Sequence, residues 1–242
     1  MDKIFGRPKS LRNISTHYCA GCGHGIAHRL IAEVIDELGI RERVIAVAPV
    51  GCAVTAYDYW NFDCSEAAHG RALAVACAIK RTRPENIVFT YQGDGDLIAI
   101  GTNETIHTAN RGENLTVIFI NNAVYGMTGG QMAPTTLLAQ KTATTPKGRD
   151  AKLQGYPLKI SEMLATLAAV KFIARVSLHS PLEVIKAKQA IKQAFGNQMD
   201  NVGFSMVEIL SPCPTYWDLN PKEALDWIRD AMVKEFPLGR IK

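Results

Sequence analysis

Two short polar turns follow two strand-like segments, and their side chains suit the binding of a phosphate together with a metal ion. Residues 93–96 read Gly-Asp-Gly-Asp and follow the run 86–91, while residues 121–122 are two asparagines that follow the apolar run 115–120. A helix-length segment separates the two units. Both turns are therefore expected at the carboxyl ends of neighbouring parallel strands, where open α/β sheets bind their ligands.

The first turn predicts a magnesium–diphosphate site. Glycine lets backbone N–H groups approach an anion closely, and a helix N-terminus adds favourable partial charge. Asp94 stands in the same turn and would repel a phosphate unless a cation lay between them. Mg²⁺ is usually held by one or two protein oxygens together with phosphates and water. We expect Asp94, the side-chain oxygen of Asn122 and a carbonyl of the following loop to complete such a site.

The cysteines suggest a second site at the same edge of the sheet. Cys19 and Cys22 form a Cys-x-x-Cys pair, which alone is compatible with structural zinc, a redox dithiol or half of an iron–sulfur site. Cys52 follows the first strand-like run and Cys213 follows the last one. Both are thus expected beside the two polar turns. Four thiolates fit zinc and a [4Fe–4S] cluster equally well by count.

The remaining candidates have ordinary interpretations. Cys77 lies in a helix of small residues and is expected in the core, and Cys64 is expected to be a bystander. His24 and His28 begin an amphipathic helix and are expected to cap it or to face solvent. His69 precedes another helix, where it could meet a phosphate or a cofactor ring.

The two polar turns together resemble the thiamine diphosphate motif of thiamine-dependent enzymes. Residues 125–131, Tyr-Gly-Met-Thr-Gly-Gly-Gln, and residues 19–24, Cys-Ala-Gly-Cys-Gly-His, narrow the resemblance. The chain looks like the β subunit of a 2-oxoacid:ferredoxin oxidoreductase of the 2-oxoisovalerate or 2-oxoglutarate branch, and the match covers nearly the whole chain. The resemblance implies CoA-dependent oxidative decarboxylation of a 2-oxoacid to an acyl-CoA, with electrons passed through a [4Fe–4S] cluster to ferredoxin.

The same resemblance implies thiamine diphosphate, Mg²⁺ and a [4Fe–4S] cluster as cofactors and coenzyme A as co-substrate. It places the cluster on Cys19, Cys22, Cys52 and Cys213, and it adds the backbone carbonyl of Val124 to the magnesium ligands. The residues expected around the cofactor are Gly51, Cys52, His69, Gly93, Asp94, Gly95, Asp96, Asn122, Gly126, Met127 and Thr128.

A catalytic carboxylate is expected from another chain. Thiamine enzymes activate the cofactor through a glutamate that bonds its aminopyrimidine ring, and the resembled family supplies this glutamate from an α subunit. We find no glutamate suited to the role here, and Glu66 is the nearest. The resemblance therefore implies an α subunit that completes the active site, γ and δ ferredoxin-like subunits with further clusters, and ferredoxin as electron acceptor.

Composition fits one α/β domain that works in the cytoplasm. Of the 242 residues, 47% are hydrophobic and 21% are charged, and the net charge is +4. There is no long basic run for nucleic acid, no apolar stretch that could span a membrane and no apolar signal region. We expect a mostly parallel sheet with helices on both faces, in a single domain 1–242 with an N-terminal arm, 1–18, and a loop that covers the cofactor, about 123–158.

Apolar periodicity predicts the individual elements. The expected helices are 25–38, 67–81, 97–111, 160–169, 181–195 and 221–236, and the expected strands are 43–50, 86–91, 115–120, 171–176 and 203–210.

Two rival functions explain part of the sequence. A zinc-stabilised cysteine-site protein without redox activity, for example one that binds nucleic acid, would use the cysteines and the positive charge. It leaves both polar turns unexplained and lacks a basic stripe. A thiamine enzyme of the decarboxylase or acetolactate type would hold both cofactor-binding domains in one longer chain and would lack the cysteines.

Overall fold

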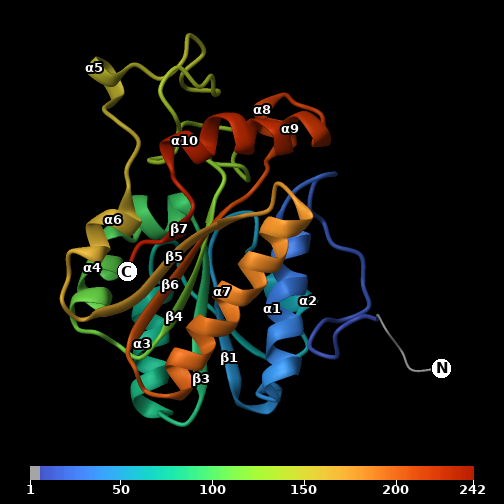
Figure 1. The fold of residues 1–242 in the computed structure, drawn as a ribbon, viewed down its shortest axis with the longest axis vertical. Coiled ribbons are helices and arrows are strands. Elements are labelled where there is room, and N and C mark those ends of the chain that lie inside the picture. The colour runs from blue at the N-terminus through green and yellow to red at the C-terminus, as the bar shows by residue number, and fades with distance from the viewer. Residues whose placement is uncertain (1–5) are drawn as a thin grey trace.

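The computed structural model describes residues 6–242, and within them the chain forms a seven-stranded sheet (Figure 1). The strand order is β2-β1-β3-β4-β6-β5-β7, and every pair is parallel except β5 with β7. The mostly parallel sheet predicted from the sequence is therefore confirmed. The strands are β1 Val44–Ala48, β2 Asp63–Glu66, β3 Ile87–Gly93, β4 Thr116–Asn121, β5 Val170–Ser177, β6 Phe204–Leu210 and β7 Gly239–Arg240.

Helices cover both faces of the sheet, as a parallel sheet requires (Figure 1). α1 and α7 pack on one face, and α3, α4 and α6 pack on the other. In the first half of the chain the helices and helical turns are α1 His24–Leu38, η1 Arg41–Arg43, α2 Ala56–Tyr59, α3 Ala72–Thr82, η2 Gly95–Ile100 and α4 Thr102–Asn110. In the second half they are α5 Ala151–Gln154, α6 Ile160–Ala165, α7 Pro181–Met199, α8 Pro214–Trp217, α9 Pro221–Trp227, η3 Ile228–Met232 and α10 Val233–Glu235.

The central strand β4 shows how the core sets the position of the polar turns. Its side chains alternate between two apolar clusters, with Ile118 and Ile120 on the α1/α7 side and Val117 and Phe119 on the opposite side. A shift of one residue would exchange the two faces. The register that buries this strand thus also fixes where its carboxyl end delivers the two asparagines.

Several predicted boundaries differ from the structure. α3 begins at Ala72 rather than at 67, because the preceding residues turn tightly around Gly70, whose φ is +76°. The predicted helix 97–111 is divided into the π-helix η2 and α4. The backbones of Gly70 and Gly101 meet at this division, where a Cβ on Gly101 would lie 2.9 Å from the Gly70 carbonyl oxygen.

A third layer lies beyond the carboxyl ends of the strands. The segment 123–158 and helices α8, α9 and α10 gather there, at the top of Figure 1. Apolar side chains from the start of the segment, the end of β6 and the C-terminal helices form one cluster: Ala123, Leu137, Leu210, Ile228, Met232 and Phe236. The segment expected to cover the cofactor is thus packed against the last helices of the chain.

The described part of the N-terminal arm, from residue 6 onward, lies against the body of the protein. Leu11 pairs with Trp60 in an isolated β-bridge, and the Ser10 hydroxyl donates to Asp36 of α1 at 2.6 Å. The first five residues of the predicted arm are outside the described residues. Within residues 6–242, none of the helices combines the length and apolar character needed to cross a membrane.

Candidate active site

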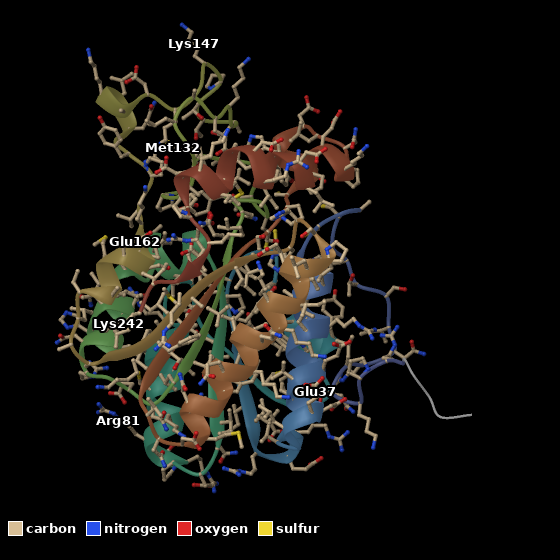
Figure 2. The ribbon with its side chains drawn as sticks, viewed as in Figure 1. Glu37, Arg81, Met132, Lys147, Glu162 and Lys242 are labelled. Carbon is tan, nitrogen blue, oxygen red and sulfur yellow. The ribbon has the colours of Figure 1, made fainter. Side chains whose placement is uncertain are left out.

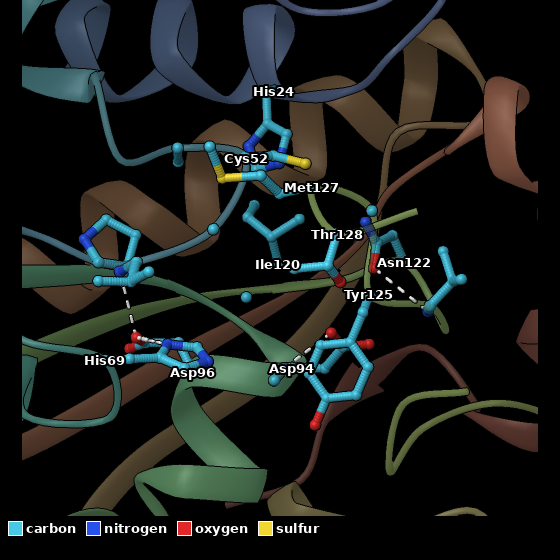
Figure 3. Close-up of a pocket in the computed structure, with 18 residues that line it drawn as sticks. His24, Cys52, His69, Asp94, Asp96, Ile120, Asn122, Tyr125, Met127 and Thr128 are labelled. Atoms are coloured by element: carbon cyan, nitrogen blue, oxygen red, sulfur yellow. Dashed lines mark hydrogen bonds and ion pairs between the residues drawn. The ribbon is translucent and has the colours of Figure 1, made fainter. Parts of the chain in front are cut away.

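One pocket collects the residues that the sequence assigned to the cofactor (Figure 3). It lies at the carboxyl ends of β1, β3 and β4, and we call it the strand-end pocket. The predicted residues that line it are Gly51, Cys52, His69, Gly93, Asp94, Gly95, Asp96, Asn122, Val124, Gly126, Met127 and Thr128. Its other lining residues are His24, Pro49, Val50, Ala53, Ile120 and Tyr125.

The glycines of the pocket have two different roles. A Cβ placed on Gly51 or Gly93 would meet nothing within 4 Å, so the backbone at these positions is open to a ligand. A Cβ on Gly95 would lie 1.9 Å from the ring of Tyr125. Gly95 is therefore required because the Tyr125 ring packs directly on the turn.

Asp94 is a buried carboxylate without a cationic partner among the described residues. Its side chain is the N-cap of η2 and accepts hydrogen bonds from the Gly95 N–H at 2.8 Å and from the Thr135 hydroxyl at 2.5 Å. Burial raises the pKa of Asp94 to about 7, although these hydrogen bonds lower it. A divalent cation would supply the missing positive charge, so the residues present fit Mg²⁺.

The second polar turn, which follows β4, contacts Asp94 through the backbone of Val124. The Val124 N–H donates to the side-chain oxygen of Asn122 at 3.4 Å and also to Asp94, whose pKa it helps to lower. Trp217 of α8 donates its indole N–H to the Asn122 carbonyl oxygen at 3.0 Å. Ala123 between them has a φ of 56°, the left-handed region that residues other than glycine seldom adopt. The three residues predicted to bind magnesium thus line one pocket, and the Val124 N–H joins the turn after β4 to Asp94.

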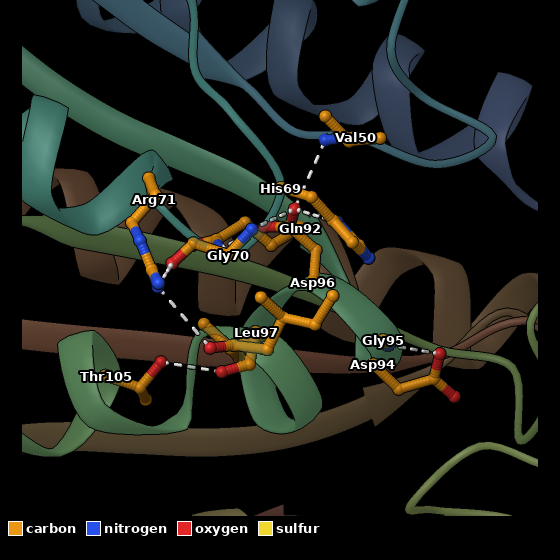
Figure 4. Close-up of polar contacts among 11 residues, drawn as sticks. Val50, His69, Gly70, Arg71, Gln92, Asp94, Gly95, Asp96, Leu97 and Thr105 are labelled. Carbon is orange, nitrogen blue, oxygen red and sulfur yellow. Dashed lines mark hydrogen bonds and ion pairs between the residues drawn. The ribbon is translucent and has the colours of Figure 1, made fainter.

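Asp96 lines the pocket, but its carboxylate is occupied by the protein itself (Figure 4). One oxygen accepts from the Val50 N–H, the Gly70 N–H and His69 Nδ1 at 3.2, 3.0 and 2.8 Å, and the other accepts from Gln92 at 2.5 Å. These partners come from the ends of three separate segments. Asp96 therefore fixes the walls of the pocket around His69.

The predicted cysteines line a second cavity, which we call the cysteine cavity. Cys19, Cys22, Cys52 and Cys213 all lie on it. Burial raises the pKa of Cys22, and it raises the pKa values of Cys52 and Cys213 to about 12; the neighbouring thiols add to each shift. Such thiols need a bound metal to become thiolates. Among residues 6–242, no three His, Cys, Asp or Glu side chains lie close enough together to bind a single metal ion. The four cysteines are therefore related by the cavity that they line.

Backbone N–H groups point at two of these sulfurs. The His24 N–H bonds the Cys22 sulfur and the Tyr216 N–H bonds the Cys213 sulfur, and both bonds lower the thiol pKa. Each donor lies in the first turn of a helix, α1 or α8. Positive partial charge at these helix starts favours a negatively charged group in the cavity.

The strand-end pocket and the cysteine cavity share a wall. His24, Cys52, Asn122 and Gly126 line both. A Cβ on Gly126 would lie 2.9 Å from the Cys52 sulfur and 3.8 Å from the Cys213 sulfur. A single layer of residues therefore separates the two sites, and only glycine at 126 lets the backbone pass so close to the thiols.

The expectation that His24 and His28 cap a helix or face solvent is wrong. They are only 4% and 1% exposed, and they lie in a cluster of aromatic side chains. His24 Nδ1 is 2.7 Å from the Tyr91 hydroxyl, and His28 Nε2 is 3.1 Å from the Tyr18 hydroxyl. Burial lowers the pKa of His24 to about 4, so its ring is neutral near pH 7. Local sequence carried no signal for this, because Tyr91 belongs to β3.

Two further residues were not predicted. Thr135 holds Asp94, and Tyr125 packs on Gly95; the threonines of the loop were visible in the sequence but formed no motif. Glu66 ends β2 and does not line the strand-end pocket. Among the described residues, the lining of this pocket contains no glutamate.

Comparison with known proteins identifies the family to which the chain belongs. Residues 49–209 match the thiamine pyrophosphate enzyme, C-terminal TPP binding domain. Ketoisovalerate oxidoreductase subunit VorA of Methanothermobacter thermautotrophicus is 52% identical over 99% of this chain and 52% of its own length. 2-Oxoglutarate synthase subunit KorB of Archaeoglobus fulgidus is 36% identical over 90% of this chain and 77% of its own length. The chain thus spans about half the length of the VorA subunits it matches.

A solved structure extends the comparison to the fold. The 2-oxoglutarate:ferredoxin oxidoreductase from Magnetococcus marinus, with 2-oxoglutarate, coenzyme A and succinyl-CoA bound, superposes with a TM-score of 0.79 at 28% identity. The alignment covers 94% of this chain and 74% of that one. The chain belongs to the thiamine pyrophosphate enzyme family, among the 2-oxoacid oxidoreductase subunits that carry its TPP-binding domain.

Proposed function

We propose that this chain is the thiamine diphosphate-binding subunit of a 2-oxoacid:ferredoxin oxidoreductase. The complete enzyme would decarboxylate a 2-oxoacid oxidatively, transfer the acyl group to coenzyme A and pass two electrons to ferredoxin. One observation carries the proposal: the strand-end pocket and the cysteine cavity share the wall formed by His24, Cys52, Asn122 and Gly126. A redox cofactor and its electron acceptor need such proximity, whereas a purely structural zinc site does not.

The residues of the strand-end pocket suit a magnesium–diphosphate group. Asp94, the side-chain oxygen of Asn122 and the carbonyl of Val124 would hold Mg²⁺, and the open backbone at Gly51 and Gly93 would lie against the cofactor. When bound, thiamine diphosphate supplies the electron sink that 2-oxoacid decarboxylation requires. Tyr125, packed on the metal turn, would help to exclude water from the metal.

The cysteine cavity suits a [4Fe–4S] cluster. Cys19, Cys22, Cys52 and Cys213 would hold it, and the backbone N–H groups that bond the sulfurs of Cys22 and Cys213 favour its negative charge. The similarity to a 2-oxoglutarate:ferredoxin oxidoreductase supports iron–sulfur over zinc, because electron transfer to ferredoxin needs a redox-active group and zinc is not one.

The substrate class is a small 2-oxoacid, and we place 2-oxoisovalerate first. The relative named for ketoisovalerate is 52% identical to this chain, whereas the relative named for 2-oxoglutarate is 36% identical. Substrate side-chain contacts are expected partly from an α subunit, which would also supply the activating glutamate. We further propose γ and δ ferredoxin-like subunits as partners and the cytoplasm as the site of the reaction.

The test is an assay of the purified complex. The complex should be brown, show a cluster signal in electron paramagnetic resonance, and reduce ferredoxin when given coenzyme A and a 2-oxoacid. Comparison of 2-oxoisovalerate, 2-oxoglutarate, pyruvate and arylpyruvates by kcat/KM would identify the substrate. A colourless complex that contains zinc and forms no acyl-CoA would refute the proposal.

A further inference from the structure

His24 is the wall residue to which the proposed function gives no role. Cys52 and Asn122 are proposed ligands, and Gly126 has no side chain. His24 is the first residue of α1, and its ring lines both the strand-end pocket and the cysteine cavity (Figure 3). Its side chain is therefore placed to act on a group bound in one of the two sites.

The hydrogen bond to Tyr91 fixes which ring nitrogen carries the proton. The Tyr91 hydroxyl is fully buried and lies 2.7 Å from His24 Nδ1, its only hydrogen-bond partner in the described part of the chain. If Nδ1 donated, the hydroxyl proton would be left buried without an acceptor, which is unfavourable. Tyr91 therefore donates to Nδ1, and the proton of the neutral ring lies on Nε2.

The Nε2 edge of the ring is left for the shared wall. No hydrogen bond in residues 6–242 uses His24 Nε2. The ring stacks on Tyr18, which lines the cysteine cavity, with 4.8 Å between centroids and an interplanar angle of 19°. The backbone N–H of the same residue already bonds the Cys22 sulfur. Both contacts place His24 with the sulfur chemistry of the cysteine cavity.

We propose that His24 donates its Nε2–H to a sulfur of the iron–sulfur group held in the cysteine cavity and thereby raises the reduction potential of that group. Tyr91 is the positioning residue that keeps the proton on Nε2. The inference rests on the proposed function. A hydrogen bond to sulfur stabilises the reduced cluster, which carries one more negative charge, and hydrogen bonds to the sulfurs are among the factors that set cluster potentials. The donor would favour electron transfer out of the strand-end pocket.

The experiment is a redox titration of the cluster in the assembled complex, followed by electron paramagnetic resonance. His24→Phe keeps a ring and removes the donor, so its midpoint potential should shift to a more negative value. His24→Gln keeps an N–H donor and should restore most of the wild-type potential. Tyr91→Phe, which frees the tautomer, should shift the potential in the same direction by a smaller amount. His28→Gln, one turn further along α1 and in neither site, should leave it unchanged.

Thiamine diphosphate affinity, measured by calorimetry on the same variants, separates the alternatives. Unchanged affinity with a shifted potential supports the inference. An unchanged potential with weakened cofactor binding would assign the His24 N–H to the cofactor and overturn the inference. No change in either the potential or the affinity would also overturn it. If His24→Phe does not assemble, Tyr91→Phe decides, because it removes only a hydroxyl. Absence of any cluster signal in the wild-type complex would instead overturn the proposed function.

Discussion

Asp94 shows how a single buried carboxylate prepares a metal site. It lies at 3% exposure with hydrogen bonds from Gly95 and Thr135 but without a positive neighbour in the described residues. Burial disfavours its charged form, which raises its pKa to about 7. The protein thus keeps a carboxylate oriented and partly desolvated, and a bound cation is what such an arrangement lacks.

Thr135→Val should weaken cofactor binding without unfolding the protein. Valine has nearly the same shape as threonine, but it cannot donate to Asp94, so the carboxylate would lose its orientation. Loss of a residue that orients a metal ligand typically lowers metal affinity by about 10–100-fold. Calorimetric titration of the complex with thiamine diphosphate at fixed Mg²⁺ measures the effect. Thr142→Val is the matched control, because it removes a buried hydroxyl contact to Thr145 in the same loop but away from the pocket.

Cys213→Ser should separate the two sites. Cys213 lines the cysteine cavity but not the strand-end pocket, whereas Cys52 lines both. We expect the serine variant to lose ferredoxin reduction while it retains most of its thiamine diphosphate affinity, because Cys213 does not line the strand-end pocket. Cys64→Ser, on β2, should retain both properties. Full ferredoxin reduction by Cys213→Ser would remove this residue from the cluster ligands.

At the scale of elements, apolar periodicity predicted the strands that are buried in the core. It missed a strand whose formation depends on pairing with another part of the chain. Strands β1, β3, β4, β5 and β6 were all expected, and α1 ends at Gly39 in the left-handed conformation as its glycine suggested. β2 was missed because it is only four residues long and its sequence, Asp-Cys-Ser-Glu, is mostly polar. Its pairing with β1 is what makes it a strand.

The residues of the site likewise fall into those that local sequence predicted and those that it did not. Glycine, aspartate, asparagine and cysteine at strand ends could be read from local spacing, because the topology brings strand ends together. The partners that hold them could not be read, since Thr135 lies 41 residues from Asp94 and Tyr91 lies 67 residues from His24. The assignment of the metal and cluster ligands itself remains a prediction, which the substitutions above test.

One buried side chain, Arg149, contributes much of the hydrogen bonding that holds the segment 123–158. Arg149 is 6% exposed, and its guanidinium group donates to the carbonyl oxygens of Pro134, Thr136, Gln154, Gly155 and Tyr156. Five carbonyls on both sides of the arginine are thereby gathered around a single cation. Thr135 lies between two of these carbonyls, so the same contacts hold the hydroxyl that bonds Asp94.

Arg149→Met should therefore loosen this segment and weaken cofactor binding together. Methionine fills part of the space but donates no hydrogen bond, and each lost bond to a charged group is worth about 1.5–3 kcal/mol. Hydrogen exchange should become faster across 132–158, and thiamine diphosphate affinity should fall. Lys147→Met is the matched control, because Lys147 lies on the outside of the same segment, at the top of Figure 2. Unchanged exchange in Arg149→Met would show that the apolar cluster alone holds the segment.

At the scale of the whole molecule, features of the strand-end pocket and of the adjoining segment fit the partner subunit that the proposed function requires. Among residues 6–242 its lining supplies aspartates and histidines but no glutamate. Met127 on its lining is 54% exposed, and Leu153 and Tyr156 on the adjoining segment are 81% and 73% exposed. Exposed large apolar side chains are typical of surfaces that another protein covers. We therefore expect the proposed α subunit to cover Met127.

The isolated chain should accordingly hold its cluster but fail to turn over a 2-oxoacid. Under the proposed function, its own residues would bind the metal–diphosphate group and the iron–sulfur group, and the α subunit would supply the carboxylate that activates the cofactor. Addition of the α subunit should restore acyl-CoA formation and viologen reduction, measured from the same preparation before and after mixing. Met127→Glu should weaken this restoration, because a charge at this position would be buried against the partner at a cost of several kcal/mol. Since Met127 also lines the strand-end pocket, thiamine diphosphate affinity has to be measured on the same variant, and only a loss of restoration at unchanged affinity indicates weaker docking. Lys222→Glu, on the exposed start of α9 outside the pocket lining, is the control for an added negative charge. Turnover by the isolated chain alone would show that a carboxylate of this chain activates the cofactor.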